Sequence, residues 1–223
     1  KIDFSKLGLN STRIKTTVHY DLQKSINSLL QRYHQQFKSN GINNVAALVL
    51  SVETGNSLAY VGNVSDPGDP EAEGQVDMIP ASRSPGSTLK PILYASMLSD
   101  GLFLPNSLVP DVPTQIGGYT PQNFDLGYDG AVPASKALYR SLNIPAVKML
   151  QQYKYERFHQ QLKNLGITTL KKPADFYGLS LILGGCETSM WDLSGVYASM
   201  ARTVNHYNRY KRKYNGDDYH APN

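Results

Sequence analysis

The stretch RSPGSTLKPILY, residues 83–94, decides how the rest of the chain is interpreted. Proline and glycine crowd its start, and Lys90 stands before an apolar run, where charges are uncommon. Ser87 and Lys90 are three residues apart, so their side chains would share one face of a helix. The free N–H groups at a helix N-terminus favour negative charge on the serine oxygen. These features predict a helix from Ser87 to about Asp100 that carries an active site.

The pair has the chemistry of a nucleophile and its base. A serine hydroxyl is a poor nucleophile without a base, and lysine accepts a proton only when neutral, from an unperturbed pKa of about 10.4. Lowering that pKa by about three units costs about 4 kcal/mol, which burial of the ammonium can supply. Because the residues after Lys90 are almost all apolar, we expect this lysine to be buried. The alternative is a surface serine beside a lysine that reaches solvent, the commoner meaning of an isolated S-x-x-K.

A second polar pair lies in the sequence Ser141-Leu142-Asn143, where one helical pattern (133–142) ends and the next (145–152) begins. In a non-helical link, residues two apart can point the same way. They would then offer a hydroxyl to relay a proton and an amide to hold a lysine or a peptide group. The alternative is that Asn143 is a helix C-cap. Ser25-Ile26-Asn27 has the same spacing but lies inside a predicted helix, where a cleft is not expected.

The rest of the chain predicts an α+β fold. Periodicity indicates helices at 21–39, 154–164 and 189–202, the last capped by Thr188 or Ser189, strands at 45–52 and 57–62, a possible strand at 13–19, and a long loop at 102–132. Two strands make a poor sheet on their own. We therefore expect the sheet to need C-terminal strands that are missing from this chain.

Composition limits the classes of function. Apolar residues make up 40% of the 223 residues and the formal net charge is +4, as in a soluble globular protein. The single Cys186 excludes an internal disulfide, and no apolar run is long enough to cross a membrane. The basic, aromatic run 206–214 could contact nucleic acid, but such runs are more often solvated helix faces, so we predict no nucleic-acid partner. The histidines lack ligand spacing, and we predict no metal and no cofactor.

S-x-x-K followed by S-x-N resembles the signature of penicillin-binding proteins and serine β-lactamases. Longer stretches are similar to the transpeptidase domain of class A penicillin-binding proteins, especially the 1C type: RSPGSTLKPILY, YTPQNFDLGYDGAVPASKALYRSLNIPAVKML and LSLILGGCETSMWDLSGVYASMA. NVAALVLSVETGNSLAYVGN resembles that domain's first hairpin, and the likeness runs from about Lys15 to the end. It implies a β-lactamase/transpeptidase-like fold, an antiparallel sheet flanked by helices with a helical subdomain. Residues 1–44 would be the lead-in strand and helix, and 45–223 an incomplete transpeptidase domain.

The resemblance also implies residue roles. Ser87 would be the acylated nucleophile and Lys90 its general base. Ser141 would relay the proton to the leaving D-alanine or from the incoming amine, and Asn143 would contact Lys90 and the substrate backbone. The likeness also covers the loop that holds Tyr119, Pro121 and Asn123, to which we assign no chemical role.

The activity implied is that of a peptidoglycan D,D-transpeptidase, acylated by D-Ala-D-Ala stem peptides and trapped by β-lactams. The implied context is a membrane-anchored protein on the periplasmic face of the bacterial inner membrane, with a glycosyltransferase domain outside this chain. Two alternatives remain open. A carboxypeptidase, β-lactamase or penicillin-sensing domain would pass the acyl group to water or hold it, and a scaffolding module would do no chemistry.

The third motif of the family, K-T-G, does not occur in these 223 residues, and neither does K-S-G. The resemblance places it on a strand beside the serine, where it binds the substrate carboxylate and supplies part of the oxyanion hole. Losing one oxyanion donor can cost about 10²–10³ in rate. We expect the motif to follow Asn223, the chain to be part of a longer domain, and this chain alone to be a poor enzyme.

Overall fold

The computed structural model describes residues 15–66, 68 and 72–223, which divide into two compact units. The first unit comprises the described residues up to Ile79 together with Pro222–Asn223, and the second comprises Pro80–Ala221. The boundary between the units falls after Ile79, because the first helix packs on the hairpin and belongs with it. The chain leaves the first unit, forms the whole of the second, and then returns.

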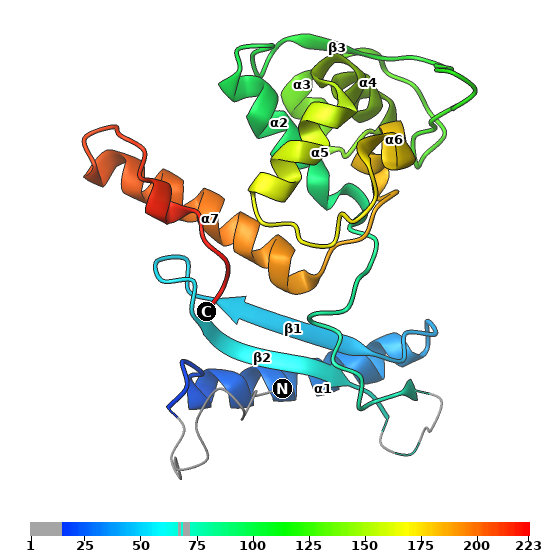
Figure 1. The fold of residues 1–223 in the computed structure, drawn as a ribbon. Helices are drawn as coiled ribbons and strands as arrows, with labels where there is room; N and C mark the ends of the chain where they lie inside the picture. Colours follow the sequence, from blue (N-terminus) through cyan, green and yellow to red (C-terminus); the bar gives the residue numbers. More distant parts are fainter. Residues whose placement is uncertain (1–14, 67, 69–71) are drawn as a thin grey trace. The chain divides into compact units, whose positions relative to one another are not determined.

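The first unit is a helix packed on a β-hairpin (Figure 1). Helix α1 (Tyr20–Lys38) lies against the antiparallel strands β1 (Val45–Leu50) and β2 (Ser57–Val64), in which Leu48 is opposite Tyr60. The Gln23 side chain bonds both backbone groups of Tyr60, accepting its N–H at 2.8 Å and donating to its carbonyl at 3.1 Å. These contacts occupy the outer edge of β2. The predicted helix and hairpin are confirmed.

The strand predicted at 13–19 is wrong for the described residues 15–19, and 13–14 lie outside the described part. The His19 N–H does bond the Leu58 carbonyl at 2.8 Å, as a ladder would require. However, His19 is also the N-cap of α1, and its Nδ1 accepts from the Leu22 N–H. The chain therefore turns into the helix before a third strand can form.

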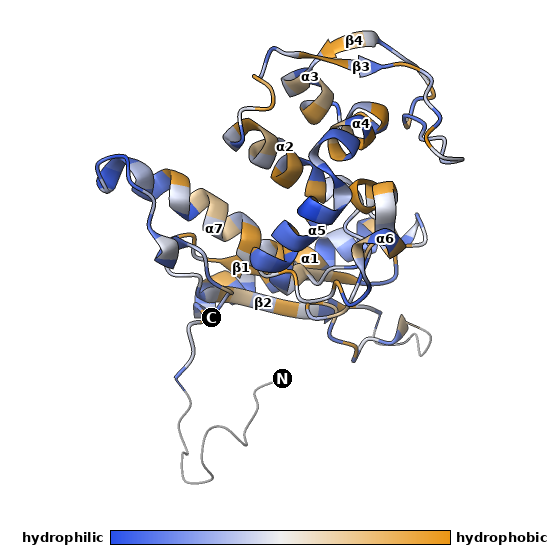
Figure 2. Cartoon of the chain, turned by 45° about the horizontal axis from the view of Figure 1, so that its top comes forward, coloured by the Kyte–Doolittle hydropathy of each residue, from blue (hydrophilic) through white to orange (hydrophobic). Residues whose placement is uncertain are grey.

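The second unit is largely helical (Figures 1 and 2), and its core includes buried side chains of α2. Its elements in chain order are a 3₁₀ turn (Gly86–Leu89), α2 (Lys90–Ser99), β3 (Leu108–Asp111), β4 (Gly130–Pro133), α3 (Ala134–Tyr139), α4 (Asn143–Tyr153), α5 (Tyr155–Asn164), α6 (Ala174–Tyr177), a 3₁₀ stretch (Gly178–Leu183), α7 (Met190–Arg209) and a 3₁₀ turn (Gly216–Asp218). Fully buried side chains of α2, α4 and α5 form much of the core: Ile92, Leu93, Met97, Val147, Leu150, Phe158 and Leu162. The apolar residues that follow Lys90 in the sequence thus belong to this core.

Two sequence expectations for this unit need correction. Ser87 lies on a 3₁₀ turn and not on the α-helix, which begins at Lys90 with a proline in its first turn. The region 102–132 is not all loop, because β3 and β4 pair across it with Asp111 opposite Gly130. Each of these strands has four residues, too few for a clear alternating pattern, and Pro110 in β3 also argues against a strand.

The final helix confirms its predicted cap and runs further than expected. Ser189 Oγ accepts from the Asp192 N–H at 2.9 Å, and α7 continues to Arg209. His206, part of the basic run, is buried, with Nδ1 2.7 Å from Asp218 Oδ1. Among the described residues, no helix is long and apolar enough to cross a membrane.

Candidate active site

The turn that carries Ser87 is held by a segment about a hundred residues later. Ser84 Oγ donates to the Gly184 carbonyl at 2.8 Å and accepts from the Gly86 N–H at 3.3 Å. Arg83 and Thr188 exchange backbone hydrogen bonds of 3.0 and 2.8 Å. Ser87 itself is exposed, and within the described part its hydroxyl makes no hydrogen bond to protein. The hydroxyl is thus available on a turn whose backbone is fixed.

Gly184 shows how closely the two segments approach. Its φ is +90°, and a Cβ there would lie 2.6 Å from the Gly86 nitrogen. Such a contact cannot be accommodated without moving the turn, so only glycine fits. On another side, Tyr197 of α7 donates from its hydroxyl to the Thr88 carbonyl at 2.7 Å. Both contacts restrain the backbone next to Ser87.

Lys90 is buried, with 4% of its surface exposed, as the sequence predicts. Burial lowers the pKa of Lys90 from 10.5 to about 8. Its Nζ lies 2.7 Å from the Ser141 carbonyl oxygen, 3.2 Å from Ser141 Oγ and 2.7 Å from Asn143 Oδ1. Residues i and i+3 eclipse in a 3₁₀ turn, so Ser87 and Lys90 still share a face. The surface-lysine alternative is therefore wrong.

Ser141 approaches Lys90 through an unusual backbone conformation. Its φ is +56°, a left-handed value that L-residues other than asparagine and aspartate seldom adopt. It follows α3, where the Ser141 N–H bonds the Leu138 carbonyl and the Leu142 N–H bonds the Ala137 carbonyl. This closes the helix in the way glycine usually does. The result is that both the carbonyl and the hydroxyl of Ser141 reach the same ammonium.

Asn143 is the first residue of α4, so the C-cap alternative for it is wrong. Its Oδ1 accepts from Lys90, while its Nδ2 donates to the Gln122 carbonyl at 2.8 Å. The structure thus brings Lys90, Ser141 and Asn143 into direct contact, with Ser87 on the turn that leads into Lys90. The other S-x-N match, Ser25–Asn27, lies within α1 in the first unit.

Sequence reasoning missed the residue behind this group. Asn123 is 3% exposed, and its Oδ1 accepts from the N–H groups of Asn143 and Ile144 at 2.9 and 3.3 Å. It lies in the region assigned as loop, where a single asparagine is unremarkable. The sequence signal that could have pointed to Asn123 is its place in the stretch 119–150 that resembles the family, but that resemblance did not indicate a role for it.

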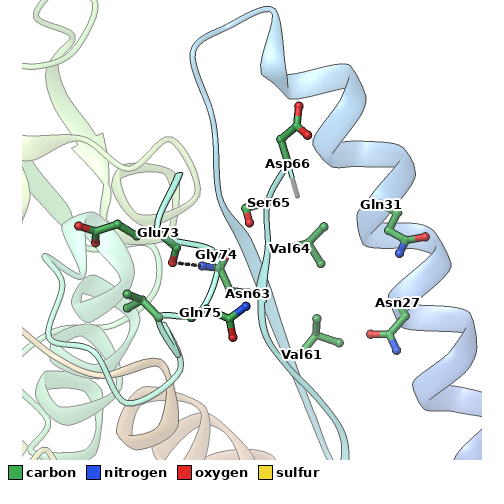
Figure 3. Close-up of a pocket in the computed structure, with 11 residues that line it drawn as sticks. Asn27, Gln31, Val61, Asn63, Val64, Ser65, Asp66, Glu73, Gly74 and Gln75 are labelled. Carbon is green, nitrogen blue, oxygen red and sulfur yellow. Dashed lines mark hydrogen bonds between the residues drawn. The ribbon is translucent and has the colours of Figure 1, made fainter. Parts of the chain in front are cut away.

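A hollow of about 740 Å³ lies in the first unit between α1, β2 and the segment that follows β2 (Figure 3). α1, β2 and the segment after β2 each contribute polar side chains to its lining, which includes Asn27, Gln31, Asn63, Asp66 and Glu73. None of the described residues that line it is a buried titratable group, and Ser87, Lys90, Ser141 and Asn143 are not among them. The chemistry that the sequence predicts therefore belongs to the second unit.

Comparison with known proteins identifies the family. The model of the penicillin binding protein transpeptidase domain matches residues 45–204. The chain belongs to this family. Penicillin-binding protein 1C of Escherichia coli is 38% identical over 202 residues, which are 89% of this chain and 26% of that protein. Penicillin-binding protein 1F of Bacillus subtilis is 34% identical over 159 residues, 70% of this chain and 21% of that protein. The chain thus spans about a quarter of the length of these curated relatives.

Solved structures of penicillin-binding proteins share the fold. The PonA1 protein of Mycobacterium tuberculosis in complex with penicillin V superposes with a TM-score of 0.71 at 20% identity, covering 90% of this chain and 54% of that one. The TP domain of Burkholderia pseudomallei penicillin-binding protein 3 gives 0.69 at 18% identity, covering 86% and 60%. The predicted α+β, transpeptidase-like fold is confirmed.

Proposed function

We propose that this chain carries the serine-acylating centre of a peptidoglycan D,D-transpeptidase and binds β-lactams. The observation that carries the proposal is the environment of Lys90. This lysine is buried one turn after the exposed Ser87, and its amine contacts Ser141 and Asn143, the S-x-N pair of the family. At about pH 7.5, a lysine with a pKa of about 8 is neutral in about a quarter of molecules, against about a thousandth at 10.5. A base with a pKa near the working pH is effective in general catalysis.

In acylation, these groups transfer one proton from the serine to the leaving amine. Ser87 Oγ bonds to the carbonyl carbon of the penultimate D-alanine, and its proton passes to Lys90 Nζ. The amide C–N bond then breaks, and the leaving D-alanine amine takes a proton through Ser141 Oγ. Neutral Lys90 keeps two donors for its acceptors and presents its lone pair to the serine. Asn143 fixes the amine through its Oδ1.

Deacylation reverses the proton path. An amine of a neighbouring stem peptide attacks the Ser87 ester carbon, the ester C–O bond breaks, and the amine proton returns to Ser87 Oγ by way of Ser141 or Lys90. The new amide is the cross-link. Transfer to water in place of the amine would make the same centre a carboxypeptidase or β-lactamase.

The proposed cellular context follows the relatives. We place the centre on the periplasmic face of the bacterial inner membrane, in a protein that also carries a glycosyltransferase domain. The proposal gives Ser87, Lys90 and Ser141 the catalytic roles and assigns substrate contact to Asn143, with no metal and no cofactor.

The test is intact mass after incubation with a β-lactam. The natural protein that contains this chain should gain one adduct, the same protein with Ser87→Ala should gain none, and Ser82→Ala, an exposed serine five residues earlier, should label normally. Analysis of stem-peptide products then separates cross-linking from hydrolysis. If the folded protein stays unlabelled, the transpeptidase proposal is wrong and the non-catalytic scaffolding alternative replaces it. The 223-residue chain, tested alongside, should label more slowly because it lacks K-T-G.

A further inference from the structure

The amide of Asn123 is buried in a segment whose neighbours Gln122 and Phe124 are exposed. It makes four hydrogen bonds, which use both of its ends. Oδ1 accepts from the N–H groups of Asn143 and Ile144, and Nδ2 donates to Asp111 Oδ1 at 2.8 Å and to a loop carbonyl at 2.9 Å. A buried amide with every partner supplied is rigidly held.

The contacts on Oδ1 orient the start of α4. The first N–H groups of a helix lack partners within the helix, and Leu142, which precedes α4, provides no side-chain cap. Asn123 provides that cap from 20 residues earlier in the chain. The adjacent Gln122 carbonyl binds Nδ2 of the Asn143 side chain. Together, neighbouring residues fix both the backbone and the side chain of Asn143, and this leaves Asn143 Oδ1 directed at Lys90.

Asp111 determines which way the Asn123 amide faces. Asp111 is 1% exposed, and its two oxygens accept from Asn123 Nδ2 and from the Asp129 N–H at 2.9 Å. A carboxylate only accepts hydrogen bonds, so the nitrogen of Asn123 must face Asp111 and its oxygen must face α4. The strand β3, which carries Asp111, is thereby linked to Lys90 through hydrogen bonds of Asn123 and Asn143.

We propose that Asn123, oriented by Asp111, is a positioning residue that holds Asn143 Oδ1 against the Lys90 amine. The inference rests on the proposed function, in which Lys90 is the base for Ser87. Asn123 touches neither the serine nor the lysine and acts only through Asn143. A displacement of about 1 Å at a catalytic group can cost about 100-fold in rate.

A double-mutant cycle on β-lactam acylation tests the pathway in the natural protein that contains this chain. Asn123→Ala should slow acylation by about 10–100-fold when Asn143 is present, and by no more than about twofold in an Asn143→Ala background. A loss of stability alone would act equally in both backgrounds, and equal slowing would overturn the inference. Asn44→Ala is the matched control, since Asn44 also donates two amide hydrogen bonds, but in the first unit. It should leave acylation unchanged.

Exchanging the two side chains provides a rescue. Asn123→Asp alone would place two buried carboxylates opposite each other, so the acylation rate of this variant should be severely reduced. When Asp111→Asn is added, the new amide at position 111 would donate an N–H to the new carboxylate at position 123, and the other oxygen of that carboxylate would still accept from the N–H groups at the start of α4. The double variant should therefore recover most of the acylation rate. Failure of the folded double variant to recover would count against the proposed pairing.

Titration of Lys90 by NMR in the 223-residue chain gives a readout that needs no acylation. Asn143→Ala removes an acceptor from the Lys90 ammonium and Asn123→Ala displaces the same acceptor, so each should lower the pKa of Lys90, and the double variant should lower it no further. An unchanged Lys90 titration in Asn123→Ala would overturn the inference. If the wild-type protein fails to label, the proposed function fails, and this titration still decides the role of Asn123.

Discussion

At the scale of single residues, Lys90 combines a burial that destabilises its charge with three acceptors that stabilise it. The folded chain holds the pKa of Lys90 at about 8, against 10.5 for a lysine in water. Between these values the unfolded chain binds a proton that the folded chain has released. The contribution of Lys90 to the unfolding free energy therefore rises with pH across this window, and below it the full cost of burying the charge is present.

This predicts a measurable pH dependence. Relative to Lys90→Met, the unfolding free energy of the wild-type chain should rise by about 2 kcal/mol from about pH 7 to about pH 9.5. Urea unfolding of both proteins at the two pH values measures the change, since other titrating groups cancel in the difference. A difference that stays constant with pH would show that Lys90 titrates as it does in water.

Two substitutions at Ser141 distinguish the role of its backbone conformation from that of its hydroxyl. At φ +56° a glycine is less strained than an alanine, so Ser141→Gly should be more stable than Ser141→Ala by about 1 kcal/mol. Both variants lack the hydroxyl that we propose relays the proton, so they should acylate at the same reduced rate. Thermal unfolding and acylation kinetics check the two parts. If Ser141→Gly is both more stable and faster in acylation than Ser141→Ala, the backbone carbonyl, and not the hydroxyl, is the important contact to Lys90.

At the scale of elements, the Ser87 turn depends on its fit against the loop at Gly184. Gly184→Ala should displace the turn, because the new Cβ would meet the Gly86 nitrogen at 2.6 Å, and acylation should fall by about 100-fold. Gly101→Ala is the control, since its φ is also positive, at +68°, but a Cβ there has nothing within 4 Å. It should cost about 1–2 kcal/mol of stability and leave acylation intact. Equal acylation rates in both variants would contradict the inference that the close contact between Gly184 and Gly86 positions the Ser87 turn.

The elements that the sequence revealed are those with a strong local pattern. Helical spacing predicted α1 and α7, and the apolar runs predicted β1 and β2. Strands β3 and β4 have four residues each and are stabilised by a partner about 20 residues away, which no local pattern records. The 3₁₀ turn escaped prediction because spacing alone does not separate it from an α-helix.

The site follows the same division. Ser87 and Lys90 could be found from sequence because they are three residues apart, and Ser141 and Asn143 because they are two apart. Asn123 contacts Asp111 and Asn143 at separations of 12 and 20 residues, with no motif to join them. The hydrogen bonds that orient the motifs therefore had to come from the structure.

At the scale of the whole molecule, Pro222 and Asn223 return to the hairpin of the first unit. The Ser57 N–H donates to the Asn223 carbonyl, and the Asn223 N–H donates to the Gly55 carbonyl, each at 2.9 Å. Removing Pro222 and Asn223 from the 223-residue chain should raise the hydrogen-exchange rate of the Ser57 amide by about tenfold or more. The Gly55 amide, which bonds Ser51 at 2.8 Å, is the control within the same turn. An unchanged Ser57 amide would show that the returning segment does not protect the turn.

This return sets the order in which the chain can finish folding during synthesis. Asn223 Nδ2 donates to the Thr54 carbonyl across 169 residues of sequence, so the ribosome must release the entire second unit before that contact can form. Closing so long a loop carries an entropic cost that grows with the logarithm of its length, and a second unit that is already compact reduces the span to be closed. The residues of the hairpin turn are thus synthesised before the second unit, and their hydrogen bonds with Asn223 can form only after the second unit has been synthesised.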